Sequence, residues 1–179
     1  CVFITHQLNV LSGNTTWMSS KAHQKIIKKF DACWVPDVES KPNLTGKLGH
    51  LKKPKSNIIY LGHLSRFEKK DTPYHYNLMV LLSGPEPQRT LLEEKLLEEL
   101  QQFEGNVLFV RGKIEGSQTK EEHKTNKSTI TLYNYMQSAE LEIALNQSEK
   151  VLCRSGYTTV MDLAKLEKKA FFIPTPGQY

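Results

Sequence analysis

The residues best suited to chemistry lie in the segment Cys153-Arg154-Ser155-Gly156-Tyr157-Thr158-Thr159. This segment offers a hydroxyl that can cap a helix, a glycine that allows close approach of a backbone to a ligand, and a following helical pattern that carries Asp162. The free N–H groups and the dipole of a helix N-terminus attract anions. We therefore predict that these backbone amides bind a phosphate and that Asp162 accepts hydrogen bonds from ribose hydroxyls. A lone Ser-Gly pair before a helix is more often an ordinary N-cap.

Two further segments follow apolar runs in the same way. Ser83 and Gly84 come after the run 78–82, and residues 174–178, which include Gln178, come after the run 170–173. In an open parallel sheet, ligands bind where the carboxyl ends of the strands turn into helix N-termini. All three segments are therefore candidates for one binding edge.

The elements that must position these residues alternate along the chain. Hydrophobic periodicity predicts helices over residues 16–30, from about 88 to 103, 138–146 and 155–168. It predicts short buried strands over residues 2–5, 32–35, 57–61, 78–82, 107–110, 130–133, 151–153 and 170–173. Strands that alternate with helices in such short runs predict βαβ units, a parallel sheet and an α/β fold.

Polar stretches separate some of these elements. Residues 36–57 form a polar connection rich in proline and glycine, and residues 112–128 are predicted to be a mobile loop or partly disordered. In the helix that ends near Phe103, leucines at four-residue spacing form an apolar stripe, and the glutamates, Glu93 among them, are expected to face water.

One αβ series ends before residue 66 and another begins after residue 76. We predict one domain over residues 1–65, a linker over 66–76 and a second domain over 77–179. The first of these holds about three strands and one helix, which is little for a closed doubly wound domain, and the chain opens on Cys1 without an initiator Met. We therefore expect the N-terminal domain to be incomplete and the second domain to be truncated at its C-terminal end.

The composition is that of a folded globular protein, with 39% hydrophobic and 24% charged residues among 179. The apolar runs are far shorter than the roughly 20 residues that a membrane-spanning helix needs. The net charge of +5 comes from clusters of lysine, which suit solvated helix ends or attraction to phosphates and anionic membrane surfaces. Asp-x-Asp, Cys-x-x-Cys and His-Glu-x-x-His motifs do not occur, which disfavours a transferase that holds its donor through a metal ion.

Taken together, these segments resemble MurG-type glycosyltransferases, which transfer N-acetylglucosamine from its UDP conjugate to a lipid-linked acceptor. The family segment reads approximately C-R-S-G-x-x-T-V-x-E. Residues 153–162 follow it closely, and Thr159 stands at the position of the threonine in that pattern. The chain departs from the pattern at Asp162, which stands in place of the ribose-binding glutamate and is one methylene shorter.

The resemblance assigns further residues to the donor. Gly62-His63-Leu64-Ser65-Arg66 is similar to the family's Gly-Asn-Pro-Val-Arg, which implies that Arg66 lies near the donor diphosphate. Ser83 and Gly84 stand where the family has a Gly-Gly-Ser-Gln-Gly-Ala loop, although the prolines that follow remove amide donors. The resemblance also places the backbone of Asn134 against uracil, and Gln178 at the start of a loop that contacts the donor sugar.

On the acceptor side, Thr5-His6-Gln7-Leu8-Asn9 resembles the family's His-Glu-Gln-Asn segment and matches it at His6 and Asn9. The resemblance therefore implies that these two residues face the acceptor and that His6 is a candidate acid or base. The glutamate of the family segment is absent, and a histidine at a strand end is commonly a structural residue.

The resemblance implies a GT-B architecture of Rossmann-like domains and an inverting transfer of a hexose or N-acetylhexosamine from a UDP-sugar to a lipid-linked or polysaccharide acceptor. No cofactor and no metal ion would be required, and the protein would be cytoplasmic, with peripheral contact at the inner face of the membrane. A UDP-sugar 2-epimerase of the same architecture is the first alternative. A non-catalytic nucleic-acid binder is a remote one, because an aromatic strand platform and a basic recognition helix are not apparent and nucleic acid is not an expected partner.

Overall fold

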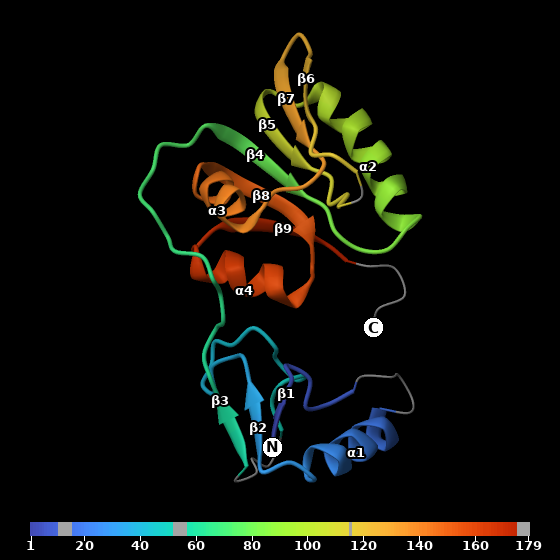
Figure 1. The fold of residues 1–179 in the computed structure, drawn as a ribbon, viewed down its shortest axis with the longest axis vertical. Coiled ribbons are helices and arrows are strands. Elements are labelled where there is room, and N and C mark those ends of the chain that lie inside the picture. Colours follow the sequence, from blue (N-terminus) through green and yellow to red (C-terminus); the bar gives the residue numbers. More distant parts are fainter. Residues whose placement is uncertain (11–15, 52–56, 115, 175–179) are drawn as a thin grey trace. The chain divides into compact units, whose positions relative to one another are not determined.

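The computed structural model describes residues 1–10, 16–51, 57–114 and 116–174. The chain divides into two compact units, of which Cys1–Ser65 forms unit 1 and the segment that begins at Arg66 forms unit 2. Figure 1 labels the helices and strands of both units.

Unit 1 contains a parallel sheet of three strands, β1 (Val2–Ile4), β2 (Ala32–Val35) and β3 (Ile58–Tyr60), in the order β1-β2-β3. Helix α1 (Thr16–Ile27) connects β1 to β2. Alternation along β2 buries Cys33 and Val35 in a small core with Leu8 and Ile27, whereas Trp34 faces outward. The core of unit 1 therefore lies on one face of its sheet.

Unit 2 contains a six-stranded sheet in the order β6-β7-β5-β4-β8-β9. Its strands are β4 (Tyr76–Leu81), β5 (Gly105–Val110), β6 (Lys120–Lys124), β7 (Ser128–Tyr133), β8 (Ser148–Arg154) and β9 (Lys169–Ile173). All neighbouring pairs are parallel except β6 with β7. Its helices are α2 (Gln88–Glu99), extended by the 3-10 turn η2 (Leu100–Gln102), α3 (Ser138–Asn146) and α4 (Tyr157–Lys165).

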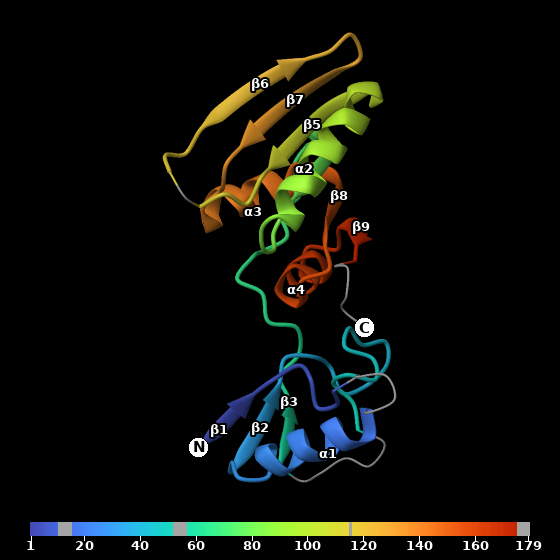
Figure 2. The same cartoon turned by 90° about the vertical axis from the view of Figure 1, so that its right-hand side faces the viewer.

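The sheet of unit 2 is buried on both faces because alternate side chains of each strand enter different cores. Met79 of β4 joins the core that α3 and α4 complete, and Val80 joins the core that includes the leucines of α2. Figure 2 shows α2 lying along β5 and β7. This layered α/β arrangement confirms the predicted fold class and brings the carboxyl ends of β4, β5, β7, β8 and β9 to one edge.

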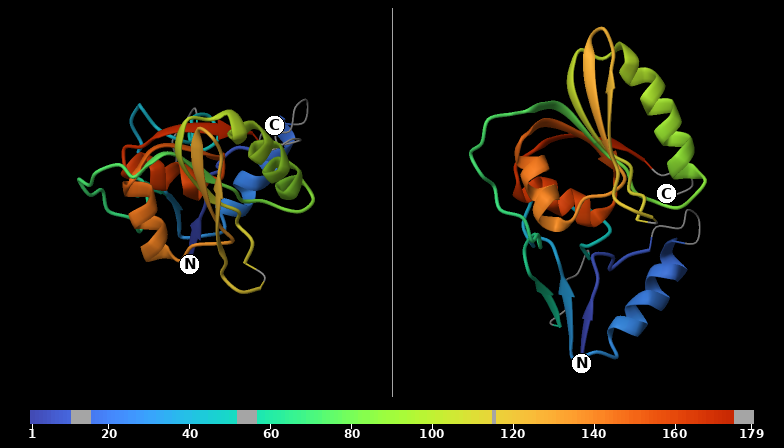
Figure 3. Two further views of the ribbon diagram at one scale, coloured as in Figure 1. Left: turned by 90° about the horizontal axis from the view of Figure 1, so that it is seen from above. Right: turned by 45° about the horizontal axis from the view of Figure 1, so that its top comes forward.

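The elements predicted from periodicity are all present, with ends that shift by a few residues. The prediction for residues 112–128 was wrong in part, because β6 runs through it as an antiparallel edge strand beside β7 (Figure 3). Every residue of β6 is exposed, and its sequence Lys-Glu-Glu-His-Lys has no apolar alternation. Backbone pairing with β7 forms the strand, and its charges suit an edge that must not recruit another strand.

Glu93 also differs from its predicted environment. Its carboxylate is buried and forms ion pairs with three cations, with N···O distances of 2.7 Å to Arg89, 2.9 Å to Arg111 and 3.5 Å to Lys113. Helical spacing alone placed it on the water-facing side of α2. Arg89 lies on the same helix, but Arg111 and Lys113 follow β5, and the helix pattern does not reveal these two cations.

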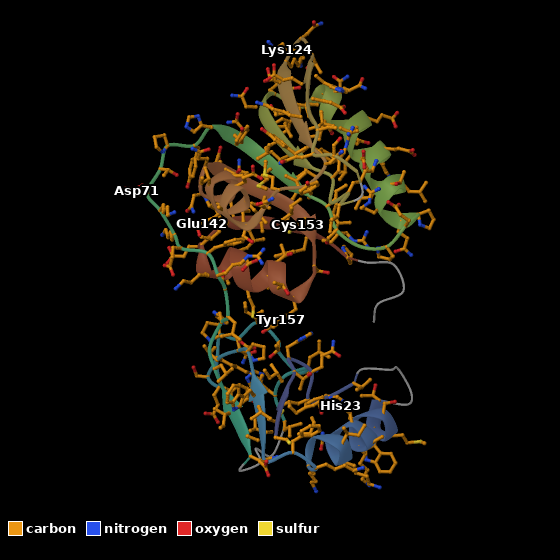
Figure 4. All side chains as sticks on the ribbon, viewed as in Figure 1. His23, Asp71, Lys124, Glu142, Cys153 and Tyr157 are labelled. Atoms are coloured by element: carbon orange, nitrogen blue, oxygen red, sulfur yellow. The ribbon has the colours of Figure 1, made fainter. Side chains whose placement is uncertain are left out.

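The segment predicted as a linker is attached to unit 2. Phe67 is buried in the core beneath α3 and α4. Asn146 accepts a hydrogen bond from the Lys70 amide (2.9 Å) and donates one to the Glu68 carbonyl (3.0 Å), and Lys70 forms an ion pair with Glu142 of α3. Figure 4 shows Glu142 on α3 and Asp71 on the connecting segment.

Candidate functional site

The segment Cys153 to Thr159, which the sequence analysis selected, forms the junction between β8 and α4. Arg154 ends β8, Gly156 is the N-cap of α4, and Tyr157 is the first residue of the helix (Figure 4). The hydroxyl cap expected from Ser155 is not formed, and among the described residues no side chain caps this helix. The N-terminus of a helix attracts anions through its N–H groups and its dipole, and this junction presents that end of α4 beside Arg154.

Arg154 is the most unusual residue of this junction. Its side chain is only 5% exposed, and its Nε and Nη2 atoms are buried without a hydrogen-bond partner in the described part of the chain. A buried charge without a partner costs several kcal/mol. Buried polar groups are otherwise nearly always satisfied, so this guanidinium points to an absent anion.

Gly84 comes close to the same guanidinium. A Cβ atom on Gly84 would lie 3.9 Å from the Arg154 Cζ and Nη1 atoms, and the backbone at Gly84 has a φ of +112°, a region that favours glycine. The structure thus brings together two predicted site residues from the neighbouring strands β4 and β8. Ser83, which precedes Gly84, is exposed.

Helix α2, which follows Gly84, offers a poorer anion site than α4. The Glu86 carboxylate accepts the Thr90 N–H in the first turn of α2 (3.2 Å) and pairs with Arg89. These hydrogen bonds, from Arg89 foremost, lower the pKa of Glu86. The N-terminus of α2 therefore already carries an anion of its own, whereas the N-terminus of α4 carries none among the described residues.

Asp162 lies in the middle of α4, one helical turn beyond Thr158 and Thr159. Its side chain is 9% exposed and takes part in an interaction within the chain, and Thr159 is half-buried. The short side chain and its burial set a tight limit on the reach of Asp162 toward a ribose.

Asn134 follows β7 at the same sheet edge and is already engaged. Its side chain bonds to Ser117 (3.2 Å) and Arg111 (3.3 Å), and its backbone carbonyl accepts the Lys113 N–H (2.8 Å). These contacts hold the loop after β7 against Arg111, Lys113 and Ser117. The Tyr135 carbonyl is engaged as well, because it accepts a hydrogen bond from Gln118 Nε2 (3.2 Å).

The other residues assigned to the donor lie elsewhere. The exposed Arg66 begins unit 2, and its guanidinium stacks 5.0 Å from the centroid of the Phe67 ring. Gln178 lies outside the described residues. The structure therefore brings Gly84 and Arg154 together near the start of α4.

In unit 1, His6 and Asn9 lie in the loop after β1. Burial lowers the pKa of the half-buried His6. The Asn9 amide donates to the carbonyls of Lys47 (2.7 Å) and His50 (3.1 Å), and its oxygen accepts from Gln24 (3.2 Å). The Asn9 side chain thus connects the loop after β1 to residues 47–50 by hydrogen bonds, which is a structural role.

Sequence reasoning missed a second polar cluster at the carboxyl edge of the sheet of unit 1. Asp37, two positions after β2, is fully buried, and His63, shortly after β3, lies beside it with 3.2 Å between Nε2 and Oδ1. The available signal was an acidic residue two positions after the end of a buried strand. It was hidden because residues 36–57 have the composition of an ordinary surface connection.

Comparison with known proteins decides the family. Residues 87–179, slightly more than half of the chain, match the C-terminal domain of glycosyltransferase family 28. The chain belongs to glycosyltransferase family 28. The matched segment contains α2, α4 and the Arg154 junction, and the parallel sheet of unit 2 is the Rossmann-like sheet of the GT-B fold.

A curated relative agrees with this family assignment and confirms the resemblance to MurG-type enzymes. The UDP-N-acetylglucosamine--N-acetylmuramyl-(pentapeptide) pyrophosphoryl-undecaprenol N-acetylglucosamine transferase of Haemophilus ducreyi is 23% identical over 182 residues. The alignment covers 96% of this chain and 45% of that relative, so the chain spans less than half the length of the protein it matches. No solved structure matches the chain significantly.

Proposed function

We propose that the protein transfers a hexose or N-acetylhexosamine, with inversion, from a UDP-sugar to a hydroxyl of a lipid-linked or polysaccharide acceptor. Family membership supports glycosyl transfer over the 2-epimerase reaction. The printed name of the relative from Haemophilus ducreyi supports a UDP-linked donor and an acceptor carried on a lipid pyrophosphate.

The buried Arg154 side chain, whose Nε and Nη2 atoms have no hydrogen-bond partner in the described part of the chain, carries the proposal. In the donor complex, oxygens of the diphosphate would accept hydrogen bonds from Arg154 Nε and Nη2 and from the amides at the start of α4. Gly84 keeps this approach open because it has no side chain. Asp162 would accept a hydrogen bond from the ribose, with Thr159 and Ser155 lining the same helix end.

The same groups supply the chemistry of the leaving group. As the bond between the sugar and the diphosphate breaks, negative charge grows on the departing UDP. A fixed guanidinium and a helix N-terminus stabilise that charge without rearrangement. Among the described residues, no group of three or more His, Cys, Asp or Glu side chains is arranged to hold a metal ion. We therefore propose metal-independent transfer, which predicts full activity in the presence of a chelator.

A lipid-linked acceptor requires access to a membrane surface, and we propose that the protein works at the cytoplasmic face of the membrane. None of the described helices has the length and apolar character to cross a bilayer. Helix α1 exposes Trp17 (69%) and Met18 (64%), and the Lys21 ammonium lies 4.3 Å from the centroid of a Trp17 ring. Apolar and basic side chains on one surface helix suit peripheral contact with anionic lipid.

Calorimetric titration of the full-length natural protein with UDP, GDP and UDP-N-acetylglucosamine tests the donor site. We expect both UDP compounds to bind more tightly than GDP. The variant Arg154→Met removes charge-assisted hydrogen bonds worth about 1.5–3 kcal/mol, so UDP affinity should fall about 10- to 100-fold. Asp162→Ala should weaken UDP binding as well.

Lys124→Met is the matched control, because it removes the same charge from an exposed position at the tip of the β6–β7 hairpin (Figure 4). UDP affinity equal to wild type in Arg154→Met would remove the main support for the donor site. Tighter binding of a single-stranded oligonucleotide than of UDP, with steep salt dependence, would instead favour the nucleic-acid alternative.

A further inference from the structure

The loop after β5 is anchored to α2 by a buried carboxylate. Arg111 Nε lies 2.9 Å from Glu93 Oε1, and the Arg111 side chain is only 16% exposed. The other carboxylate oxygen of Glu93 pairs with Arg89 Nη1 at 2.7 Å, and Lys113 Nζ lies 3.5 Å from it. Glu93 would therefore keep two cationic partners if the Arg111 side chain were replaced by an apolar one. An ion pair with a helix thus fixes one side of the Arg111 guanidinium.

The same guanidinium also contacts the loop after β7. Arg111 Nη1 donates a hydrogen bond to Asn134 Oδ1 (3.3 Å), and Asn134 Nδ2 donates one to the Ser117 carbonyl (3.2 Å). The Asn134 carbonyl accepts the Lys113 N–H (2.8 Å), and the Tyr133 carbonyl accepts the Arg111 N–H (2.9 Å). One arginine therefore connects α2, the end of β5 and the start of the loop after β7.

The remainder of this loop is held where α3 begins. Gln118 Nε2 donates to the Tyr135 carbonyl (3.2 Å), and Gln137 forms a capping box with Glu140 in the first turn of α3. Between these two fixed points, the backbone N–H and carbonyl of Met136 have no hydrogen-bond partner in the described part of the chain. Uracil presents an N–H beside a carbonyl, and a backbone carbonyl together with a backbone N–H can pair with both.

The loop before α3 lies on the same face of the sheet as the start of α4. Leu145 of α3 and Leu163 of α4 belong to one core, and Figure 1 shows the two helices next to each other. Strands β7 and β8, which lead into these helices, are separated by β5 and β4, so they lie about 14 Å apart at about 4.8 Å per strand. A nucleotide whose diphosphate binds at Arg154 can cover that distance with its ribose and base.

We propose that Arg111 is a positioning residue for recognition of the nucleotide base. Held by Glu93, it fixes Asn134 and with it the donor and acceptor of the Met136 backbone, in the order that uracil requires. Cytosine has the same size but reverses that order, because it presents an acceptor at N3 beside the amino group at C4. A loop that could shift would adjust to either base, whereas a fixed loop accepts one of them. This inference rests on the proposed function, because it takes the donor to be a nucleotide bound by its diphosphate at Arg154.

The test is calorimetric titration of the full-length natural protein with UDP, CDP and inorganic pyrophosphate. Arg111→Met should lower the ratio of UDP affinity to CDP affinity about tenfold, because the variant loses a hydrogen bond from a charged group. Its affinity for pyrophosphate should equal that of wild type, since Arg154 and the start of α4 are unchanged. Lys113→Met is the matched control, because it removes a cation beside the same carboxylate and keeps the backbone N–H that Asn134 accepts. Its UDP-to-CDP ratio should equal that of wild type.

A double-variant cycle tests the route through Asn134. Asn134→Ala should lower the UDP-to-CDP ratio as Arg111→Met does, and the double variant should lower it no further. Asn134→Asp, which keeps an acceptor for Arg111, should retain most of the wild-type ratio.

An unchanged ratio in Arg111→Met would overturn the inference, and so would additive effects in the cycle. A parallel loss of pyrophosphate binding in Arg111→Met would overturn it as well, because a purely structural role would weaken all three ligands. If wild type binds UDP and CDP equally, only this inference fails. If wild type binds neither UDP nor pyrophosphate, the proposed function itself fails, and this inference falls with it.

Discussion

The point where a side chain on Gly84 would begin lies 3.9 Å from the Arg154 guanidinium carbon. Gly84 follows β4 and Arg154 ends the adjacent parallel strand β8, so one supplies charge and the other supplies a backbone without a side chain. A side chain at position 84 would lie against the guanidinium.

Gly84→Ala tests this relationship. Because φ at Gly84 is +112°, we expect a loss of roughly 1–3 kcal/mol in the free energy of unfolding. We also expect weaker UDP binding, measured by calorimetry. Gly46→Ala is the control in unit 1, with a φ of +51° and open space around it. It should lose stability and keep its affinity for UDP; a loss of affinity as large as that of Gly84→Ala would show that strain alone explains the effect.

Arg154→Met should change stability and binding in opposite directions. Methionine fills a similar volume without a buried charge. The free energy of unfolding of the ligand-free variant should therefore exceed that of wild type by about 1–4 kcal/mol, and its unfolding temperature should be higher. UDP should then raise the unfolding temperature of wild type but not that of the variant. A less stable variant in the absence of ligand would mean that Arg154 is satisfied in the folded protein by water or another group.

Asp37 should make the stability of unit 1 depend on acid pH. Its pKa in the folded state lies below the ordinary value of 3.8, so its stabilising contribution is complete above about pH 4 and is lost as the pH falls through the folded pKa. Both tryptophans of the chain, Trp17 and Trp34, lie in unit 1, so their fluorescence reports its unfolding.

The variant Asp37→Asn should lose roughly 1–3 kcal/mol at neutral pH, because the amide donors of Val38, Leu44 and Thr45 lose their charged acceptor. Its fluorescence-detected stability should depend less on pH below 4 than that of wild type. Asp31, whose pKa is lowered by a hydrogen bond and attraction from the N-terminal amino group, remains in both proteins, so the difference isolates Asp37. Asp71→Asn, at an exposed residue of unit 2, should leave the curve of unit 1 unchanged. Parallel curves for wild type and Asp37→Asn would contradict the assignment.

Membrane contact through α1 is tested by co-sedimentation with vesicles that contain phosphatidylglycerol. The double variant Trp17→Ala, Met18→Ala should bind at least about tenfold more weakly, since each buried apolar side chain contributes about 1.5–3 kcal/mol. High salt should weaken wild-type binding because lysines contribute. Ile114→Ala, at an 81% exposed apolar residue of unit 2, serves as the control. Equal binding of the double variant and wild type would exclude α1 as the contact.

The sequence by itself determined the fold class and the β8–α4 junction. Short apolar runs that alternate with amphipathic runs are local patterns, and backbone propensity with burial is enough to turn them into strands and helices. The Cys153-to-Asp162 segment could be assigned because its chemistry lies within ten consecutive residues, and the family match over residues 87–179 agrees with it.

Only the tertiary structure decided which side chains are partners. Strand order placed Gly84 beside Arg154, 70 positions further along the chain, and left Arg154 Nε and Nη2 buried without an acceptor among the described residues. It drew Glu93 inward to Arg111, paired the wholly exposed β6 with β7, and brought His63 back to Asp37. These outcomes depend on long-range pairing and on the cost of burying charge, and neither is encoded in the periodicity of a single segment.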